Sequence, residues 1–365
     1  TLFRSNQNVA VGQQALLANT IGGLNTAIGM QALQANTTGG NNVAIGGQSL
    51  WHNITGNANV GVGVASLAST TGGSNTVIGT TAMGNNVAGS QGVAVGFEAM
   101  RFINDTATAY NITSTAVGYQ ALMGGNTPAL NTGTWNTALG YQTLLNNTTG
   151  SGNNALGFSA LKANTTGSSN IAIGQSALVV NTTGSANTAV GHATLFTNTT
   201  GADNSAIGGF SLAFNTTGSF NTSNGYQSSF QNTTGSNNVA DGAFSLYSNS
   251  TASRNSAFGY SAMFSNTTGA TNVAIGYNAI GNSRPITAGS FVIGTTYTIV
   301  TIGTTDYTLI GGASNTVGLT FVATGVGVGT GTARPNNVGS NNTAIGGYSL
   351  YNNTDGAGNV ANGIY

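Results

Sequence analysis

The sequence predicts an all-β fold, a parallel β-solenoid (β-roll) built from 17-residue coils. A tetrapeptide that ends in glycine, such as Thr26-Ala27-Ile28-Gly29, recurs 18 times along the 365 residues, and 13 of the 17 intervals between these glycines are 17 residues long. Each copy holds two apolar pieces that are too short for a helix, and β-branched residues dominate the first piece. Copies of this size bury an apolar face only by stacking on their neighbours.

The repeated positions within a coil predict ladders of equivalent residues. Asparagine stands four residues before the glycine in 16 of 18 copies, and leucine, methionine or isoleucine stands four residues after it in 16 of 17. In stacked coils, amide side chains one rung apart can hydrogen-bond to each other, and aliphatic side chains can be buried above one another. The expected ladder residues are Asn25, Asn42, Asn170, Asn187 and Asn204; Ile28, Ile45 and Ile173; and Leu33, Leu50 and Leu178. Glycine and asparagine at fixed phase are expected to supply the positive φ angles that the turns require.

Two intervals of 22 residues and one of 70 predict the domain organisation. Solenoid repeats are expected over 1–283, with loops that protrude over 97–117 and 119–139. The 70-residue interval contains alternating apolar and polar residues between glycines, which indicates an inserted small β module over 284–337. Solenoid repeats resume over 338–365. The chain begins at Thr1 without a methionine and ends in mid-pattern, so we interpret it as an internal segment of a longer protein.

Composition excludes several classes of function. Only 3% of the residues are charged, 6 Lys+Arg against 6 Asp+Glu, whereas soluble domains average about 25%. Six cations cannot form the basic surface that nucleic acid requires. The sequence contains no run of about 18 apolar residues that would span a membrane, and no cysteine for disulfides or thiolate-bound zinc. We expect no cofactor, no bound metal and no catalytic residue.

Few groups are candidates for chemistry. His192 lies near Asp203 and Ser205 in the sequence, but it occupies the variable position after the coil glycine, and a triad needs buried, mutually oriented groups. We therefore interpret His192 as a surface residue.

Glu98 and Asp105 are seven residues apart and are candidates for a carboxylate pair. The simpler interpretation is a surface ion pair between Glu98 and Arg101.

Three polar residues, Asn224, Asp241 and Asn362, stand where most copies have isoleucine or valine. They are candidates for an ion or water site at the axis of an oligomer, or for locally hydrated rungs. Aromatic residues in loops are candidates for stacking on sugars, or equally for packing the loops. The candidates for such surface binding are Trp51, Tyr110, Trp135, Tyr297 and Tyr307. The N-x-[ST] sequons are interpreted as turn and ladder residues.

The motif N-x-A-I-G-x-x-A-L resembles the head repeat of trimeric autotransporter adhesins, the YadA-like left-handed β-roll, over about 1–283 and 338–365. The longer form that contains N-T-T-G is similar to repeats of phage tail-fibre proteins. The resemblance implies a parallel homotrimer with left-handed coils and apolar faces turned inward. The 17-residue coil is longer than the adhesin repeat. Within 286–333, the string F-V-I-G-T-T-Y-T-I is similar to a module of phage virion and tail-fibre proteins, which favours the phage.

These resemblances imply a structural, non-enzymatic fibre segment, a phage tail fibre in the virion that displays elements binding the host surface. The implied partners are two further copies of the chain, a host-surface glycan or protein, and other virion tail proteins. The alternative is a bacterial trimeric autotransporter adhesin head, which would be extracellular at the cell surface. An ice-binding solenoid is disfavoured because the threonines of N-T-T-G lie in a turn, and a β-helical lyase or hydrolase lacks a carboxylate cluster.

Overall fold

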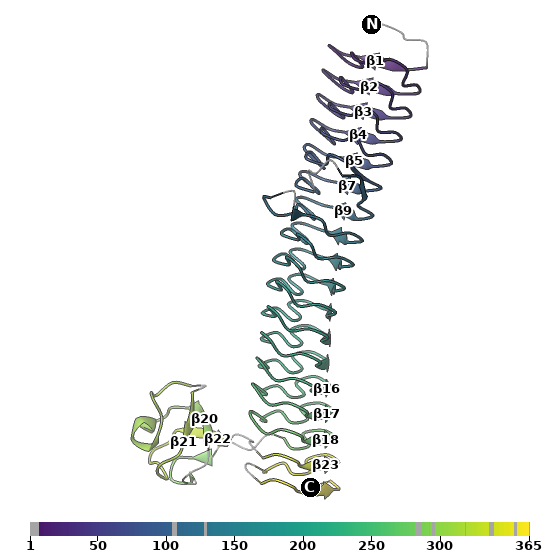
Figure 1. The fold of residues 1–365 in the computed structure, drawn as a ribbon. Helices are drawn as coiled ribbons and strands as arrows, with labels where there is room; N and C mark the ends of the chain where they lie inside the picture. The colour runs from purple at the N-terminus through teal and green to yellow at the C-terminus, as the bar shows by residue number, and fades with distance from the viewer. Residues whose placement is uncertain are drawn as a thin grey trace. The chain divides into compact units, whose positions relative to one another are not determined.

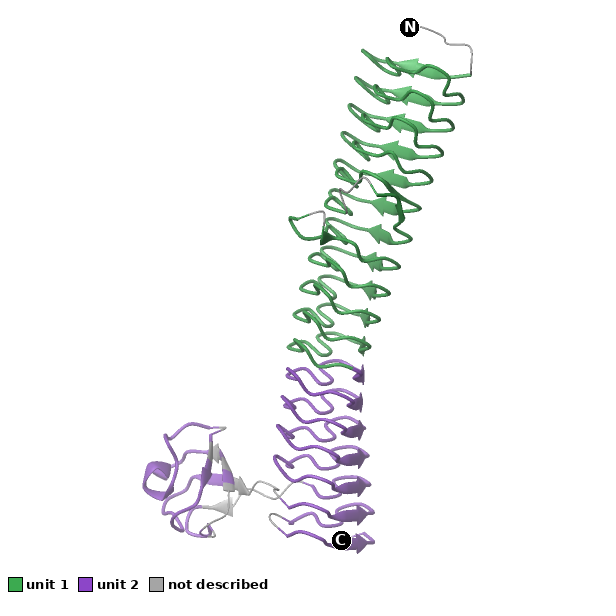
Figure 2. Ribbon diagram, viewed as in Figure 1, with its two compact units in different colours: residues 1–202 green, residues 203–365 purple. Residues whose placement is uncertain are grey.

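The computed structural model is a parallel β-solenoid with 17-residue coils and almost no helix, which confirms the predicted fold class. It describes residues 7–103, 108–127, 130–281, 286–291, 293, 296–317, 319–335, 339–353 and 356–364. The chain divides into two compact units, residues 1–202 and 203–365 (Figure 2).

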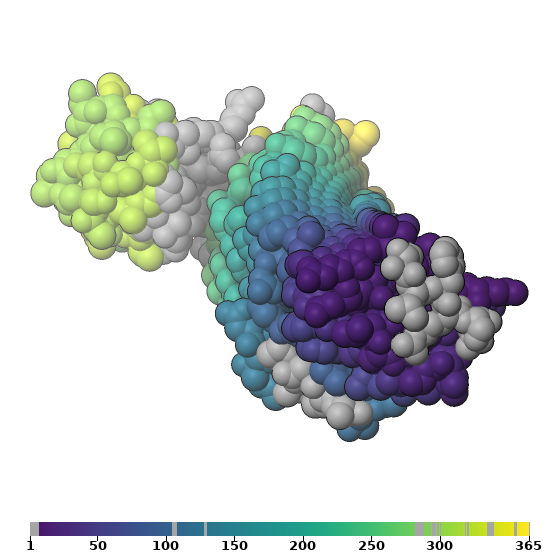
Figure 3. All heavy atoms as spheres, turned by 90° about the horizontal axis from the view of Figure 1, so that it is seen from above, coloured from purple at the N-terminus to yellow at the C-terminus, as the bar shows by residue number. Residues whose placement is uncertain are grey.

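Unit 1 stacks short parallel strands, one for each coil (Figure 1). Figure 3 views its first coils, in purple, from above. The strands of this stack are β1 (Val9–Val11), β2 (Thr26–Ile28), β3 (Val43–Ile45), β4 (Val60–Val62), β5 (Thr76–Ile78), β7 (Val93–Val95), β9 (Thr115–Val117), β10 (Thr137–Leu139), β11 (Asn154–Leu156), β12 (Ile171–Ile173) and β13 (Thr188–Val190). A separate parallel pair consists of β6 (Gly89–Ser90) and β8 (Tyr110–Asn111).

The strand register places equivalent residues above one another. Ala27 pairs with Ala10 and with Ala44. Across the two 22-residue intervals, Ala116 still pairs with the corresponding alanines of β7 and β10. The additional residues are therefore accommodated outside the strands. Residues 97–103 continue the coil, with Met100 fully buried, and parts of both predicted loops, 104–107 and 128–129, lie outside the described residues.

Alternation within each strand decides which side chains form the core. In β2 the middle residue, Ala27, is fully buried, whereas Ile28 is exposed. Side chains of adjacent strand residues point to opposite faces, so the alanine and the isoleucine cannot both point inward. The predicted isoleucine ladder is therefore wrong as a buried ladder. Its members Ile28, Ile45 and Ile173 are 39%, 39% and 40% exposed, respectively.

The predicted leucine and asparagine ladders are confirmed. Leu33, Leu50 and Leu178 are fully buried. Asn42 donates both its backbone N–H (3.0 Å) and its Nδ2 (3.1 Å) to the Oδ1 of Asn25. The predicted ladder asparagines are all buried, namely Asn25, Asn42, Asn170, Asn187 and Asn204. Each amide therefore satisfies buried backbone groups as well as its neighbour in the next coil.

A second asparagine ladder runs through the first residue of N-T-T-G, in agreement with the interpretation of the sequons as turn and ladder residues. Asn36 donates through Nδ2 to Asn19 Oδ1 (2.9 Å), and Asn164 donates in the same way to Asn147 (2.8 Å). Asn36 and Asn164 are fully buried. The sequon asparagines of N-T-T-G are thus ladder residues. The signal was the recurrence of this asparagine at the 17-residue period.

The prediction of positive φ angles is right for the coil glycines and wrong for the ladder asparagines. The left-handed conformation is adopted instead by residues such as Gln31 (φ 60°) and Leu33 (φ 50°). Such a residue costs about 1–2 kcal/mol, and burial of the leucine side chain offsets this cost. The conformation directs Gln31 N–H to the preceding coil (Gln13 O, 2.8 Å) and Leu33 N–H to the following coil (Ser49 O, 3.0 Å).

Unit 2 contains the same kind of coil. Its parallel strands are β14 (Ser205–Ile207), β15 (Thr222–Asn224), β16 (Val239–Asp241), β17 (Ser256–Phe258), β18 (Val273–Ile275), β23 (Thr343–Ile345) and β24 (Val360–Asn362). β18 pairs directly with β23, so Val273 lies opposite Thr343 although 70 residues separate them. The asparagine ladder also continues there, because Asn342 N–H donates to Asn272 Oδ1 (2.9 Å).

Between β18 and β23 the chain forms a small antiparallel sheet with its own core. Its strands are β19 (Ile286–Thr287), β20 (Thr296–Thr301), β21 (Thr320–Val322) and β22 (Thr332–Pro335), in the order β19-β22-β20-β21. A 3-10 turn, η2 (Tyr307–Ile310), begins at its cap Asp306. The core includes Phe291, Ile299 and Phe321. The predicted boundaries at 284 and 337 lie outside the described residues, so a separate module over 284–337 stays a prediction.

Candidate assembly face and surface sites

The outward residue just before the coil glycine forms an apolar column whose members are exposed or half-buried. The parallel register places Ile28 beside Ile45 on the outer face of the strands. Single exposed apolar side chains are common, but a contiguous set of them marks an interaction surface. In unit 1 this apolar column consists of Val11, Ile28, Ile45, Val62, Ile78, Val95, Val117, Leu139, Leu156, Ile173 and Val190. The corresponding apolar residues of unit 2 are Ile207, Phe258, Ile275 and Ile345.

Polar residues interrupt the apolar column of unit 2 at adjacent coils. Asn224 and Asp241 are both exposed and stand in register. The Nδ2 of Asn224 donates to the Oδ1 of Asp241 (3.1 Å). The third predicted residue, Asn362, is exposed on β24, where it pairs with Ile345. The structure therefore brings together two of the three predicted polar residues and places all three on the outer face.

Aromatic residues just after the coil glycine form a second exposed column, which the sequence analysis missed. In unit 1, Tyr119 stacks on Phe97 (centroids 5.4 Å, 13°) and on Tyr141 (5.1 Å, 7°), and Tyr141 stacks on Phe158 (5.1 Å, 4°). The face of each inner ring is occupied by its neighbours, so the rings present mainly their edges to solvent. Since stacking on a sugar needs a free ring face, this column is better suited to self-packing. The sequence pattern that indicates this column is an aromatic residue directly after the coil glycine in successive coils.

Unit 2 carries further aromatic stacks at the same spacing. Tyr247 stacks on Phe230 (5.2 Å) and on Phe264 (4.9 Å), and Tyr260 stacks on Tyr277 (5.5 Å). Burial, and then the proximity of a neighbouring tyrosine, raise the pKa of Tyr247. Tyr247 is therefore neutral at physiological pH and adds a polar edge without charge.

Three of the predicted surface-binding aromatics belong to unit 1, and they differ in how far their side chains are exposed. Trp135 is 68% exposed. Trp51 is half-buried, stacks on His52 (4.1 Å) and donates its indole N–H to Gln34. Tyr110 is half-buried, and its hydroxyl has no hydrogen-bond partner among the described residues. Burial raises the pKa of Tyr110. Trp135 alone of these three presents most of its ring to solvent.

The other two predicted aromatics, Tyr297 and Tyr307, are wrong as surface-binding residues. They are 1% and 0% exposed and belong to the core of the small antiparallel sheet. Tyr297 contacts Phe321 across the β20–β21 pair. Tyr307 donates its hydroxyl to Thr301 O (3.0 Å), and burial raises its pKa. Both rings are needed to fill this core, so neither can stack on a ligand.

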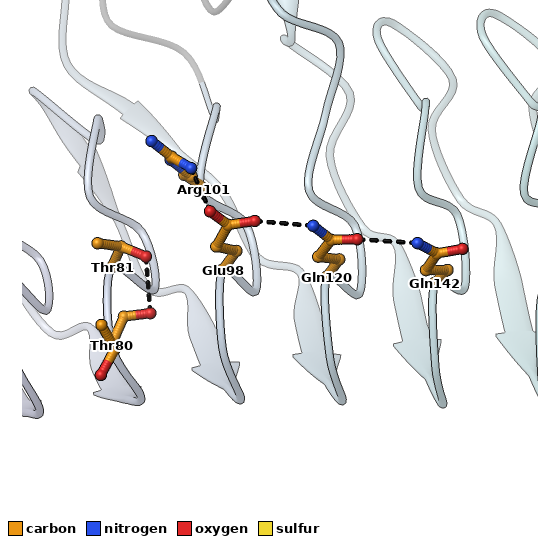
Figure 4. Close-up of polar contacts among 6 residues, drawn as sticks. All are labelled: Thr80, Thr81, Glu98, Arg101, Gln120 and Gln142. Atoms are coloured by element: carbon orange, nitrogen blue, oxygen red, sulfur yellow. Dashed lines mark hydrogen bonds and ion pairs between the residues drawn. The ribbon is translucent and has the colours of Figure 1, made fainter.

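Glu98 belongs to a ladder of side-chain amides (Figure 4). It forms the predicted ion pair with Arg101, but Glu98 is 9% exposed, so the expectation of a surface pair is wrong on the carboxylate side. The other oxygen of Glu98 accepts from Gln120 Nε2 (2.8 Å). Gln120 in turn accepts from Gln142 (2.9 Å). Glu98 thus occupies a position that holds glutamine in the two following coils, and the arginine compensates its charge. Asp105, the other half of the predicted carboxylate pair, lies outside the described residues.

The predicted triad residues fall in different units. His192 is exposed in unit 1, whereas Asp203 is exposed and Ser205 half-buried in unit 2. None of the three therefore has the burial that a triad requires.

A polar groove of about 400 Å³ lies on unit 1, where coil turns between residues 55 and 111 meet. Its lining is uncharged and consists of backbone, hydroxyl and amide groups, including Asn57, Ser74, Ser90, Gln91 and Asn111. These groups can donate and accept hydrogen bonds, but the lining includes no aromatic ring. The sequence gives no indication of this groove, because its residues come from several coils.

Among the described residues, no three His, Cys, Asp or Glu side chains come together as a metal site would require. The described part of the chain also has no helix with the length and apolarity needed to cross a membrane. No protein-family model matches the chain, and no curated protein matches it either.

Proposed function

We propose that this chain is a structural, non-enzymatic segment of a homotrimeric fibre, a phage tail fibre in the virion that carries elements binding a host-surface glycan or protein. The observation that supports this proposal most strongly is the apolar column of unit 1, which has valine, isoleucine or leucine in each of its coils. The number of copies and the virion location rest on the resemblance of the N-x-A-I-G repeat. Other virion tail proteins would join the segment at its ends.

The energetics of the apolar column favour a partner that repeats with the same spacing. Fully burying an isoleucine contributes about 1.5–3 kcal/mol, so covering the exposed 40% of Ile173 contributes roughly 1 kcal/mol. The gain per coil is small, and it becomes large only when many coils are covered together. A second copy of the chain repeats at the same rung spacing of about 4.8 Å and can contact every coil.

The threonines of N-T-T-G weigh against the ice-binding alternative. The hydroxyl of Thr148 donates to Thr165 O (2.8 Å), and that of Thr165 donates to Thr182 O (3.0 Å). These hydroxyls are engaged within the chain, which leaves only the second threonine of each turn to contact solvent. A bacterial adhesin head would use the same apolar column, and immunogold labelling of virions against bacterial surfaces distinguishes the two locations.

Light scattering after size exclusion tests the assembly. The expected mass is three times the chain mass of 36.1 kDa. The double variant Ile45→Asp/Ile173→Asp places two carboxylates on the apolar column, and we expect it to reduce the mass while the far-UV circular dichroism stays unchanged. The control Thr166→Asp/Thr183→Asp places the same charges on exposed turn positions and should keep the mass. A wild-type mass near 36.1 kDa would contradict the proposal.

A further inference from the structure

We propose that Asn224 and Asp241 fix the axial register in which copies of this chain associate. The inference rests on the proposed self-association through the apolar column. Among the coils that the structure describes, this is the one place in the apolar column where two adjacent coils carry polar side chains.

The apolar column by itself specifies register poorly. Its residues repeat at every coil, and the strands pair with identical register from coil to coil. Apolar contacts are non-directional. A copy that slides by one coil, about 4.8 Å, again places aliphatic side chains against aliphatic side chains and loses only the contacts at its ends. A periodic interface of this kind needs a non-periodic feature to select one alignment.

The polar pair supplies that feature. Asn224 and Asp241 hydrogen-bond to each other (3.1 Å), and their neighbours in the column, Ile207 and Phe258, are 46% and 40% exposed. In register, the polar pairs of all copies share one layer, where asparagine amides and water solvate the carboxylates. In a slipped arrangement, the carboxylate of one copy meets Phe258 of another. Burying a carboxylate against an apolar side chain without a donor is strongly unfavourable.

A polar layer of this kind lowers stability and increases specificity. Carboxylates gathered at one level repel each other, so the layer is less stable than an apolar one, but slipped arrangements are penalised more. The inference therefore makes two predictions with opposite signs for Asn224→Ile/Asp241→Ile. The melting temperature of the assembly should rise, and the uniqueness of its register should be lost.

Disulfide trapping measures the register, because the chain contains no cysteine. Phe258 and Ile345 lie two coils apart in the column of unit 2, roughly 10 Å along the axis, which exceeds the reach of a disulfide. Chains carrying Phe258→Cys and chains carrying Ile345→Cys are mixed unfolded, refolded together and oxidised. Peptide mass spectrometry then separates like-with-like disulfides from mixed ones.

With the polar pair intact we expect like-with-like disulfides only. With Asn224→Ile/Asp241→Ile in both chains, copies that slip by two coils should give mixed disulfides in addition to the like-with-like products. The control Asp203→Asn removes the same charge from an exposed turn outside the column and should behave as the intact pair.

Each remaining outcome contradicts the inference. A trimer whose disulfide pattern does not respond to the double substitution overturns the register role and leaves the proposed fibre standing. A trimer that forms no disulfide at either position shows that the column does not face itself, which also overturns it. A monomeric wild-type chain overturns the proposed assembly and the register role together.

Discussion

The buried asparagine ladder makes a sharp prediction at Asn42. The substitution Asn42→Ala removes the oxygen that accepts from the backbone N–H of Asn59 (2.9 Å), and Asn59 is fully buried. Two further bonds are lost, from Asn42 Nδ2 to Asn25 Oδ1 and to Gly56 O. The acceptor groups keep one donor each, because Asn53 also donates to Gly56 O (3.0 Å) and the backbone of residue 42 still donates to Asn25.

The magnitude follows from this inventory of bonds. Leaving one buried N–H without an acceptor costs about 1–3 kcal/mol, and each bond whose acceptor keeps another donor contributes about 1 kcal/mol or less. We expect Asn42→Ala to destabilise its coils by about 2–4 kcal/mol. Asn42→Asp should be worse at neutral pH, because it buries a carboxylate beside the carbonyl of Gly56 and the amide oxygen of Asn25.

Hydrogen exchange is the suitable assay because coils of a repeat protein can open locally. A loss of 2 kcal/mol speeds exchange roughly 30-fold, and the effect should centre on residues 25–72. The control is Asn57→Ala, which removes a bond to the backbone N–H of Gly40 (2.8 Å) at an exposed position. Water replaces that acceptor, so exchange should change less than about fivefold. Equal effects of the two substitutions would refute the assignment of stability to the buried ladder.

Two further predictions concern the turns. Gly174 has φ 132°, and an added Cβ would lie 2.4 Å from Gly191 O, so Gly174→Ala should cost more than about 2 kcal/mol in denaturant unfolding. The control Gly152→Ala, with φ 69° and no atom nearer than 3.7 Å, should cost about 1–2 kcal/mol. Equal costs would exclude the backbone contact as the cause. A hydrogen bond from the Thr308 side chain is the first cause that lowers the pKa of Asp306. The ionised Asp306 therefore stabilises the fold above the pKa of about 3.9 that it has in the unfolded chain, and this stabilisation is lost as the pH falls through the lower folded pKa. Acid should weaken hydrogen-exchange protection over 296–335 in the wild type but not in Asp306→Asn.

The sequence period was sufficient to predict the coils, the leucine ladder and the asparagine ladder, because each depends only on equivalent residues lying above one another. It was not sufficient to decide which apolar residue of the strand points inward. Ala27 and Ile28 are adjacent, and hydrophobicity favours burying the isoleucine, but a three-residue strand offers one inward position and the structure gives it to alanine. The burial of Tyr297 was predictable, since Tyr297 and Ile299 alternate with threonines along β20.

The interpretation of the apolar column as an assembly face is strengthened by comparing two outward positions within the same chain. The position before the coil glycine holds valine, isoleucine or leucine in each coil of unit 1. The position just after that glycine holds residues as different as Met30, Gly47, Thr80 and His192. Neither position is constrained by the core, but the first lies in a strand, which favours β-branched residues, and the second lies in a turn. The restriction of one of them to aliphatic residues fits its place in the strand and supports the proposed contact with another repeating apolar surface.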